Sequence, residues 1–283
     1  ANQYAQIQSA LAGAERVFDV MDSEPEDQGG NEPFEIENVK GDLNFKDIDF
    51  SYVKGEQVLK HFDLWVKSGQ KIAIVGATGS GKTTVVNLLT RFYDIDGGVI
   101  TLDGQDIRNI PVNKLRGSIG IVLQDTVIFS DTIAQNIRYG RIDATDEEIV
   151  EAAKIARVDD FASKLSDGYN TMLTEGGSNL SQGQRQLISI ARAVLADPKI
   201  LILDEATSSI DTRTEMHIQE AMVALMKGRT SLIIAHRLST IRDADKIVVI
   251  SGGKVVEAGD HDELLAQKGE YYKLYQSQFA GIA

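Results

Sequence analysis

The chain has 283 residues, enough for one large domain or two small ones with a substantial core. Hydrophobic residues make up 42% of it and charged residues 25%, as in ordinary globular proteins, and no apolar run approaches the roughly 18 residues that a membrane-spanning helix needs. The formal net charge of −13 disfavours nucleic acid as a partner, because nucleic-acid-binding proteins carry a basic face, and the lack of cysteine excludes disulfides and thiolate metal sites.

Residues 2–22 are predicted to form an amphipathic helix. Apolar side chains recur in this segment at helical spacing, namely Ile7, Leu11, Ala14, Val17, Phe18 and Met21. No core element precedes this helix for its apolar face to pack against. Residues 23–33 are polar and contain glycine and proline, as a linker does, so the globular part is expected to start near Phe34.

Strands and helices alternate through the rest of the chain. Residues 42–52 and 58–66 are predicted to be antiparallel strands, since apolar and polar residues alternate in the first of them. Continuous apolar runs, typical of strands buried on both faces, occur at residues 71–75, 119–123, 200–203 and 231–234. Helical patterns cover residues 82–91, 146–157, 182–196 and 213–226. This order predicts an α/β sheet with right-handed crossovers, and the mainly helical segment from about residue 126 to 184 is interpreted as an inserted subdomain.

Residues 76–83, with the sequence GATGSGKT, match the phosphate-binding pattern G-x-x-x-x-G-K-[ST] in full. A predicted strand precedes them and a predicted helix follows, which makes an idle glycine turn the weaker alternative. The glycines let backbone N–H groups point at phosphates, and the helix start adds partial positive charge. Lys82 is expected to neutralise the β- and γ-phosphates of ATP, and Thr83 to offer its hydroxyl to Mg²⁺. The predicted nucleotide-binding residues here are Gly76, Ala77, Thr78, Gly79, Ser80, Gly81, Lys82, Thr83 and Thr84.

Two carboxylates end the apolar run at residues 200–203. In open α/β sheets ligands gather beyond the carboxyl ends of the strands, which is also where the phosphate-binding loop lies. Asp204 is therefore expected to hold Mg²⁺, directly or through water, and Glu205 to polarise the attacking water. The alternative is that both acids only solubilise the end of a strand.

Residues 180–184, with the sequence LSQGQ, precede a predicted helix and resemble the LSGGQ signature of ATP-binding cassette (ABC) proteins. Gln182 replaces the first glycine of that signature, while Ser181, Gly183 and Gln184 match it. A serine cap on a helix start is physically a second anion site, although an ordinary cap has the same residues. The resemblance implies a P-loop NTPase (RecA-like) core with an antiparallel β-subdomain and an inserted α-helical subdomain.

The resemblance also implies roles for other residues and a partner. In the family, the signature of one domain closes on the ATP held by the phosphate loop of another, in a head-to-tail dimer around two ATP molecules. Tyr52 resembles the aromatic residue that stacks on adenine, and Gln124 the glutamine that touches Mg²⁺ or water. Asp211 resembles the aspartate of the loop at the dimer interface, and His236 the histidine that binds the γ-phosphate. Glu205, His236, Lys82 and Gln124 are then the expected catalytic residues.

Two features resemble the exporter branch of this family. Residues 174–177, TEGG, resemble the loop that meets the coupling helices of the partner. Residues 8–22 resemble the cytoplasmic end of the last membrane helix, and the chain begins at Ala1 instead of methionine. Residues 1–33 are therefore expected to be the end of a membrane-domain helix with its linker, and residues 34–283 a soluble nucleotide-binding domain at the cytoplasmic face of a membrane.

Other classes of function remain open at this point. An ABC importer uses a separate ATPase subunit, which normally starts at its own methionine and lacks the helix at residues 2–22. ABC proteins of DNA repair carry a long coiled coil with a Cys-x-x-Cys hook, and ribosomal members carry two cassettes; this chain has no cysteine and one phosphate-binding loop. A small-molecule kinase leaves the signature and His236 unexplained. The coding sequence before Ala1 discriminates best, because hydrophobic helices there indicate an exporter and a start codon excludes one.

Overall fold

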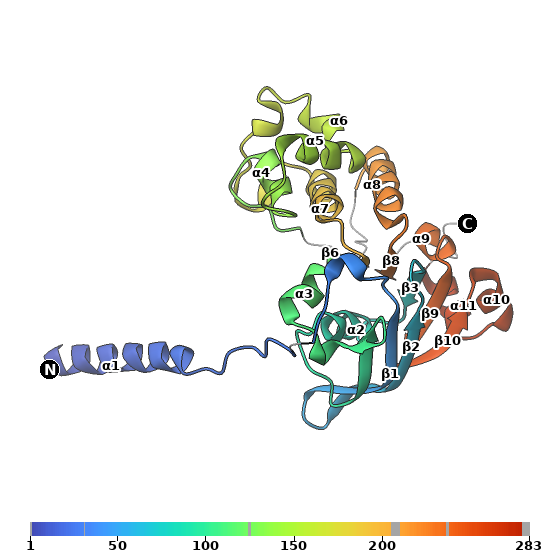
Figure 1. The fold of residues 1–283 in the computed structure, drawn as a ribbon, viewed down its shortest axis with the longest axis horizontal. Helices are drawn as coiled ribbons and strands as arrows, with labels where there is room; N and C mark the ends of the chain where they lie inside the picture. Colours follow the sequence, from blue (N-terminus) through green and yellow to red (C-terminus); the bar gives the residue numbers. More distant parts are fainter. Residues whose placement is uncertain (1, 31, 124–125, 205–209, 236–237, 279–283) are drawn as a thin grey trace.

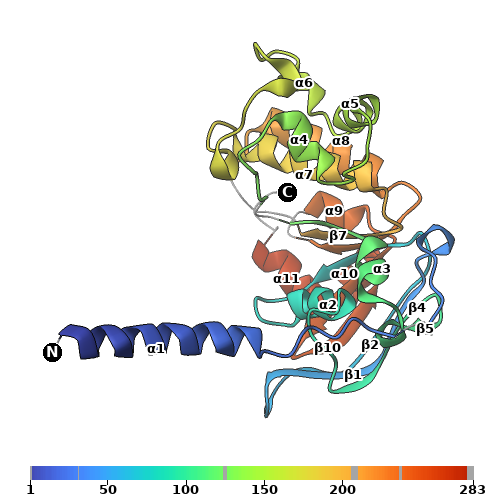
Figure 2. The same cartoon turned by 60° about the vertical axis from the view of Figure 1, so that its left-hand side comes forward.

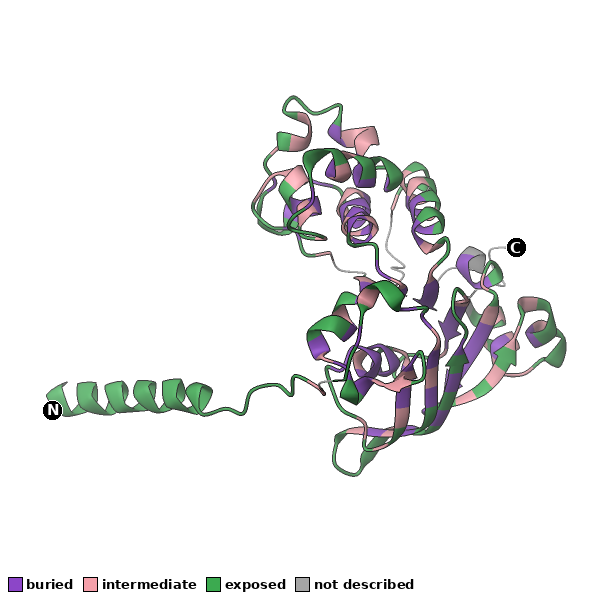
Figure 3. Ribbon diagram, viewed as in Figure 1, coloured by how far each residue is buried: buried purple, intermediate pink, exposed green. Residues whose placement is uncertain are grey.

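The structure is a computed structural model that describes residues 2–30, 32–123, 126–204, 210–235 and 238–278 (Figure 1). The first element, α1 (Asn2–Met21), projects away from the rest of the chain as a single helix (Figures 1 and 2). Its apolar side chains are exposed, including those of Ile7, Leu11 and Phe18 (Figure 3).

Within the described ranges, no helix combines the length and the apolar character that a bilayer span requires.

In the described part of the chain, two sheets make up the larger lobe. The first is antiparallel, with the order β2-β1-β4-β5, and consists of β1 (Leu43–Val53), β2 (Glu56–Val66), β4 (Gly97–Leu102) and β5 (Gln105–Asp106). The second has the order β10-β9-β3-β8-β7-β6 and consists of β3 (Lys71–Val75), β6 (Ile119–Val122), β7 (Ile200–Asp204), β8 (Thr230–Ile234), β9 (Lys246–Ser251) and β10 (Lys254–Gly259). Its strands are parallel except for β10, which pairs antiparallel with β9 at the edge.

The parallel strands are buried on both faces, which explains their continuous apolar sequences. Successive side chains of a strand point to opposite faces, so each strand contributes to two cores. Ile72 and Ile74 of β3 join the core that also contains Phe45 of the antiparallel sheet. Ala73 and Val75 join the core on the other face. The parallel sheet therefore contributes side chains to both cores, one beside the antiparallel sheet and one on the opposite face.

Helix α2 (Lys82–Leu89) packs in the first of these cores. Val85, Leu88 and Leu89 are fully buried there with residues of both sheets. The helix starts directly after the phosphate-binding loop and ends at Thr90, its C-cap. Because α2 is enclosed on several sides, its position fixes the position of the loop before it.

The second lobe is helical and lies beside the parallel sheet (Figure 1). Its helices are α4 (Ile133–Arg138), α5 (Asp146–Ile155), α6 (Asp159–Ala162) and α7 (Gln182–Ala196). Helix α8 (Thr212–Met226) shares their core. Short 3₁₀ turns lie at Gly168–Asn170 and Glu175–Gly177. In the described part of residues 126–184 the only β pairing is an isolated bridge between Thr132 and Met172. The helical character predicted for this segment agrees with these elements, whereas its exact limits stay a prediction.

The remaining elements surround the two sheets. Short 3₁₀ turns lie at Ile36–Asn38 and Ile107–Asn109, and helix α3 is Val112–Gly117. After β8 come α9 (Leu238–Arg242), α10 (His261–Gln267) and α11 (Glu270–Gln278). The Glu257 carboxylate of β10 accepts the backbone N–H groups of Glu270 and Tyr271 at 2.6 and 2.9 Å, which caps α11.

Several elements lie where the sequence predicted none. Strands β4, β9 and β10 and the C-terminal helices are absent from the predicted order, although β9 has four consecutive buried apolar residues. Strand β10 has no fully buried residue: exposed and half-buried residues alternate along it, because this edge strand is only half covered. The two predicted N-terminal strands do pair antiparallel, but they form a separate sheet with β4 and β5.

Candidate functional site

The phosphate-binding loop connects β3 to α2, as its sequence predicted. Gly81 is the N-cap of α2 with φ 110°, a left-handed conformation that favours glycine. A Cβ atom on Gly76 would lie 2.3 Å from the carbonyl oxygen of Ile250, so the loop passes too close to β9 for any side chain there. Ser80 is buried, and its hydroxyl has no hydrogen-bond partner among the described residues. An unpartnered buried hydroxyl at this point fits a phosphate oxygen.

Lys82 folds back over the loop. Its ammonium group donates to the carbonyl oxygens of Gly76 at 2.8 Å and Ala77 at 2.9 Å. Burial lowers the pKa of Lys82, and the carboxylate of Asp204 opposes that shift. The ammonium group is therefore held at the start of the loop, within the electrostatic influence of the carboxylate that ends β7.

Asp204 and the loop share one edge of the parallel sheet. Strand β7 pairs with β8 and β8 with β3, so all three carboxyl ends meet there. Asp204 is half-buried at the end of β7, and Thr83 is exposed in the first turn of α2. No group of three or more histidine or acidic side chains among the described residues could hold a metal ion by itself.

Tyr52 lies against α2, although it belongs to β1. Its hydroxyl donates to Thr84 Oγ1 at 3.2 Å and accepts from Asn87 Nδ2 at 3.0 Å. The ring packs edge-on against Phe50 and Tyr93, with centroids 4.8 and 4.9 Å away. Asn87 and Tyr93 were missed from the sequence. Asn87 carries a signal, since it follows Thr84 at helical spacing, whereas Tyr93 matches no motif.

Ser181 caps the signature helix α7. Its hydroxyl accepts the backbone N–H of Gln184 at 3.2 Å, and the Gln184 side chain accepts the N–H of Ser181 at 2.9 Å, a reciprocal capping box. Gly183 is buried, and a Cβ on it would lie 2.2 Å from Thr214 Cγ2. The half-buried Gln182 precedes it. Close contact with α8 therefore requires the glycine that the signature retains.

Asp211 caps α8, next to the signature. Its carboxylate accepts the backbone N–H of Thr214 at 3.0 Å, and this bond holds the pKa of Asp211 below its usual range. Two helix starts, those of α7 and α8, thus lie side by side and present N–H groups of partial positive charge.

The predicted site residues fall into two groups on different lobes. Residues 76–84, Tyr52 and Asp204 lie with the sheets, and Ser181, Gln182, Gly183, Gln184 and Asp211 lie with the helices, as the separation of α2 from α7 in Figures 1 and 2 shows. The predicted residues Gln124, Glu205 and His236 lie outside the described residues.

Comparison with known proteins shows the family to which the chain belongs. The sequence profile described as ABC transporter matches residues 59–208, more than half of the 283 residues. The chain belongs to the ABC transporter family.

Relatives within this family match nearly all of the chain. The fatty acid ABC transporter ATP-binding/permease protein of Mycobacterium bovis is 54% identical over 274 residues, covering 97% of this chain and 43% of that protein. The ATP-dependent lipid A-core flippase of Syntrophus aciditrophicus is 50% identical over 273 residues, covering 96% of this chain and 45% of that protein. The chain thus spans a little under half the length of these curated relatives.

A solved structure agrees with the sequence comparison. It is described as a bacterial Atm1-family ABC exporter with ATP bound, and it matches 99% of this chain and 49% of its own chain, with a TM-score of 0.86 and 39% sequence identity. The predicted P-loop NTPase fold is confirmed, and the chain is an ATPase domain of the ABC type that binds ATP.

Proposed function

We propose that this ABC domain binds and hydrolyses ATP as the motor of an exporter, in a head-to-tail dimer with a second such domain. The observation that carries the proposal is the division of the phosphate-seeking groups between two lobes. The loop before α2 and the capped start of α7 lie apart in one chain (Figure 1). A partner domain that supplies its α7 to this loop, and its loop to this α7, completes two equal sites.

In the proposed site, residues 76–84 hold the triphosphate of ATP. Lys82 leaves the two loop carbonyls that it bonds and neutralises the γ-phosphate. The unpartnered Ser80 hydroxyl and the free N–H groups at the start of α2 add donors. Tyr52 lies beside α2, where it provides an aromatic surface for adenine.

Mg²⁺ fits this site together with the phosphates. Oxygen ligands suit Mg²⁺, and Mg²⁺ usually takes one or two protein ligands plus phosphate oxygens, in accord with the lack of a three-carboxylate cluster among the described residues. Thr83, Asp204 and Gln124 are the proposed ligands, and the ion supplies positive charge against the phosphates. The side chain of Thr83 is accessible for this role at the surface.

Hydrolysis is assigned to Glu205 and His236. Glu205 orients and polarises water on the γ-phosphate, while Lys82 and His236 stabilise the charge that develops there. Ser181, Gln182, Gly183, Gln184 and Asp211 of the partner domain close the site from the other side. Loss of the γ-phosphate removes the ligand that bridges the two domains, so they separate and reset the attached membrane domain.

Export, a membrane-domain partner and the cytoplasmic face of a membrane are inferred from the relatives. Their names describe an ATP-binding/permease protein, a lipid A-core flippase and an ABC exporter. The exposed residues Glu175 and Met172, near the 3₁₀ turn Glu175–Gly177, offer a surface for that domain. Hydrophobic helices encoded before Ala1 are expected, and a start codon directly at that point contradicts the exporter.

The role of Glu205 is tested by Glu205→Gln. This variant is expected to bind ATP as the wild type does, to lose steady-state turnover, and to accumulate an ATP-bound dimer, as measured by phosphate release and size-exclusion chromatography. Glu151→Gln is a matched control, since Glu151 is exposed on α5, away from the site. An E205Q chain that hydrolyses ATP at the wild-type rate contradicts the proposed role.

A further inference from the structure

The segment that follows α1 is bound to the sheet-bearing lobe. Residues 26–30 and 32, called the strap, make three backbone hydrogen bonds to it: Gly30 N–H to the Arg108 carbonyl at 2.9 Å, Glu32 N–H to the Asn109 carbonyl at 3.3 Å, and Val112 N–H to the Gln28 carbonyl at 2.9 Å. The strap is thus a docked part of the fold, although its composition predicted a linker.

Glycines allow the strap to approach this closely. A Cβ on Gly29 would lie 2.2 Å from the Ile110 carbonyl oxygen, and one on Gly30 would lie 2.5 Å from the Asn109 carbonyl oxygen. Gly29 also has φ 79°, which favours glycine. The surface beneath the strap therefore leaves room for glycine at positions 29 and 30 and for no larger residue.

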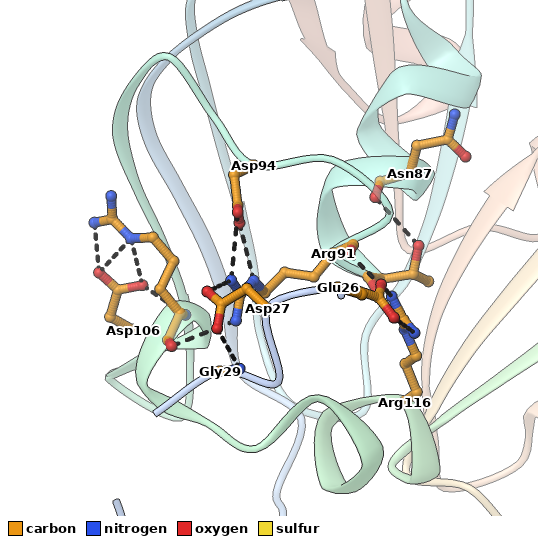
Figure 4. Close-up of polar contacts among 10 residues, drawn as sticks. Glu26, Asp27, Gly29, Asn87, Arg91, Asp94, Asp106 and Arg116 are labelled. Atoms are coloured by element: carbon orange, nitrogen blue, oxygen red, sulfur yellow. Dashed lines mark hydrogen bonds and ion pairs between the residues drawn. The ribbon is translucent and has the colours of Figure 1, made fainter. Parts of the chain in front are cut away.

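Two acids of the strap bind two arginines (Figure 4). Asp27 Oδ2 accepts a hydrogen bond from Arg91 Nη2 at 2.7 Å. The Glu26 carboxylate accepts hydrogen bonds from both terminal nitrogens of Arg116, at 2.5 and 3.2 Å. The Arg116 hydrogen bond lowers the pKa of Glu26, and the Arg91 hydrogen bond lowers that of Asp27. Both carboxylates consequently remain ionised at neutral pH.

The same two arginines hold the carboxyl-terminal end of α2. Arg116 donates from Nε to the Thr90 carbonyl and from Nη2 to the Arg91 carbonyl, both at 3.0 Å. The side chain of Arg91, two residues after α2, is only 4% exposed and also pairs with Asp94 at 2.9 Å. Cations at a helix end satisfy carbonyls that lack a partner in the helix and counter its negative dipole end.

We propose that Glu26, Asp27, Arg91 and Arg116 form a clasp that positions the phosphate-binding loop. The eight residues of α2 form one rigid body with the clasp at one end and Lys82 at the other. A shift of the clasped end therefore displaces the N–H groups that face the phosphates. Since the strap continues from α1, a force on α1 reaches the loop by this route. The inference rests on the proposed nucleotide site and names residues that act on it through α2.

The test neutralises the two acids in the whole 283-residue chain. Glu26→Gln with Asp27→Asn removes both ion pairs, while Arg91 keeps Asp94, so no buried charge is left alone. The matched control is Asp22→Asn with Glu24→Gln: both residues are exposed in the same segment, and neither side chain bonds to the described part of the chain. Both variants change the net charge equally.

Equilibrium binding of a fluorescent ATP analogue with Mg²⁺ is measured beside the melting temperature without nucleotide. The E26Q/D27N variant is expected to bind the analogue about threefold to tenfold more weakly than the wild type, a change typical of the coupling between interacting residues. The control variant is expected to bind the analogue as the wild type does. Arg116→Lys, which keeps the charge and loses the fork, is expected to weaken binding in the same direction.

Each outcome decides between a positioning and a purely structural role. Wild-type affinity in E26Q/D27N overturns the clasp, even where the melting temperature falls, because that combination means that the strap only stabilises the fold. Equal weakening in the D22N/E24Q control also overturns it, since net charge then explains the effect. A wild-type chain that does not bind the nucleotide overturns the proposed function itself.

Discussion

The ammonium group of Lys82 lies 2.8 Å from the carbonyl oxygen of Gly76. A side chain near the end of the phosphate-binding loop is thus hydrogen-bonded to the first residue of the loop. This geometry closes the loop around the position that a phosphate occupies in the proposed complex. In the proposed complex Lys82 exchanges these two loop carbonyls for phosphate oxygens, which is expected to be a gain because a charged acceptor makes the stronger hydrogen bond.

Lys82→Ala is expected to weaken ATP binding by about tenfold to a hundredfold, because a hydrogen bond to a charged group contributes about 1.5–3 kcal/mol. Isothermal titration calorimetry with ATP and Mg²⁺ measures the change. Lys164→Ala is the control, since Lys164 is exposed and its side chain makes no hydrogen bond or ion pair among the described residues, its backbone N–H alone being bonded, to the Phe161 carbonyl. Equal affinities of K82A and wild type contradict the assigned role.

Gly183→Ala is expected to destabilise the fold and reduce ATPase activity. The added Cβ meets Thr214 Cγ2 at 2.2 Å, so α7 and α8 must separate or the side chain must shift. The loss in stability is about 1–3 kcal/mol, as for overpacking in a core, and chemical denaturation measures it.

Thr214→Ser distinguishes packing from function at Gly183. Serine lacks the Cγ2 methyl group, so G183A/T214S is expected to recover most of the stability that G183A loses. Its ATPase activity is expected to stay low, because the proposed role of Gly183 also requires close approach to the partner's nucleotide. A double variant with full activity shows that only packing selects this glycine.

Asp211 gives a pH-dependent prediction. The Thr214 N–H lowers the folded-state pKa of Asp211, so the ionised cap stabilises the fold above the ordinary value of about 4 and this contribution is lost as the pH falls through the lowered pKa. Asp211→Asn keeps an acceptor without the charge, and Asp211→Ala keeps neither. The melting temperature of wild type is expected to exceed that of D211N at pH 7, with the difference shrinking in acid; a constant difference contradicts it.

Arg192 is expected to be important for the helical lobe. It donates to the Asn136 carbonyl and the Val127 carbonyl, both at 2.6 Å, and to Asn136 Oδ1 at 2.8 Å, and burial lowers its pKa. Arg192→Lys loses the planar fork and is expected to cost about 1–3 kcal/mol of unfolding free energy.

The control for Arg192 is Arg157→Lys. Arg157 pairs with Glu220 at 2.7 Å, and both side chains are about half exposed, so its loss is expected to cost less than about 1 kcal/mol. Urea unfolding of both variants measures the difference. Equal costs contradict the view that Arg192 crosslinks α7 to α4 and to the segment before α4.

The sequence allowed prediction of those features that depend on short spacing. The strand, loop and helix around Lys82, and the capped start of α7 at Ser181, follow from neighbouring residues, and the structure has them at the predicted positions. The parallel strands β3, β6, β7 and β8 were visible because burial on both faces leaves an unbroken apolar run, although β9 has such a run too and was missed. Edge strand β10, half covered, has no such run, and this explains its omission.

The sequence by itself determined the family and the phosphate-binding loop, since each can be read from motifs of a few consecutive residues, and it supplied the residues of the proposed site as predictions. Only the tertiary structure decided how these parts lie in space. It separated α2 from α7 on two lobes, and it brought Asp27 to Arg91, 64 positions away, and Glu26 to Arg116, 90 positions away. Such pairs form when the sheets and α2 pack together, and no local pattern in residues 23–33 distinguishes a docked strap from a free linker.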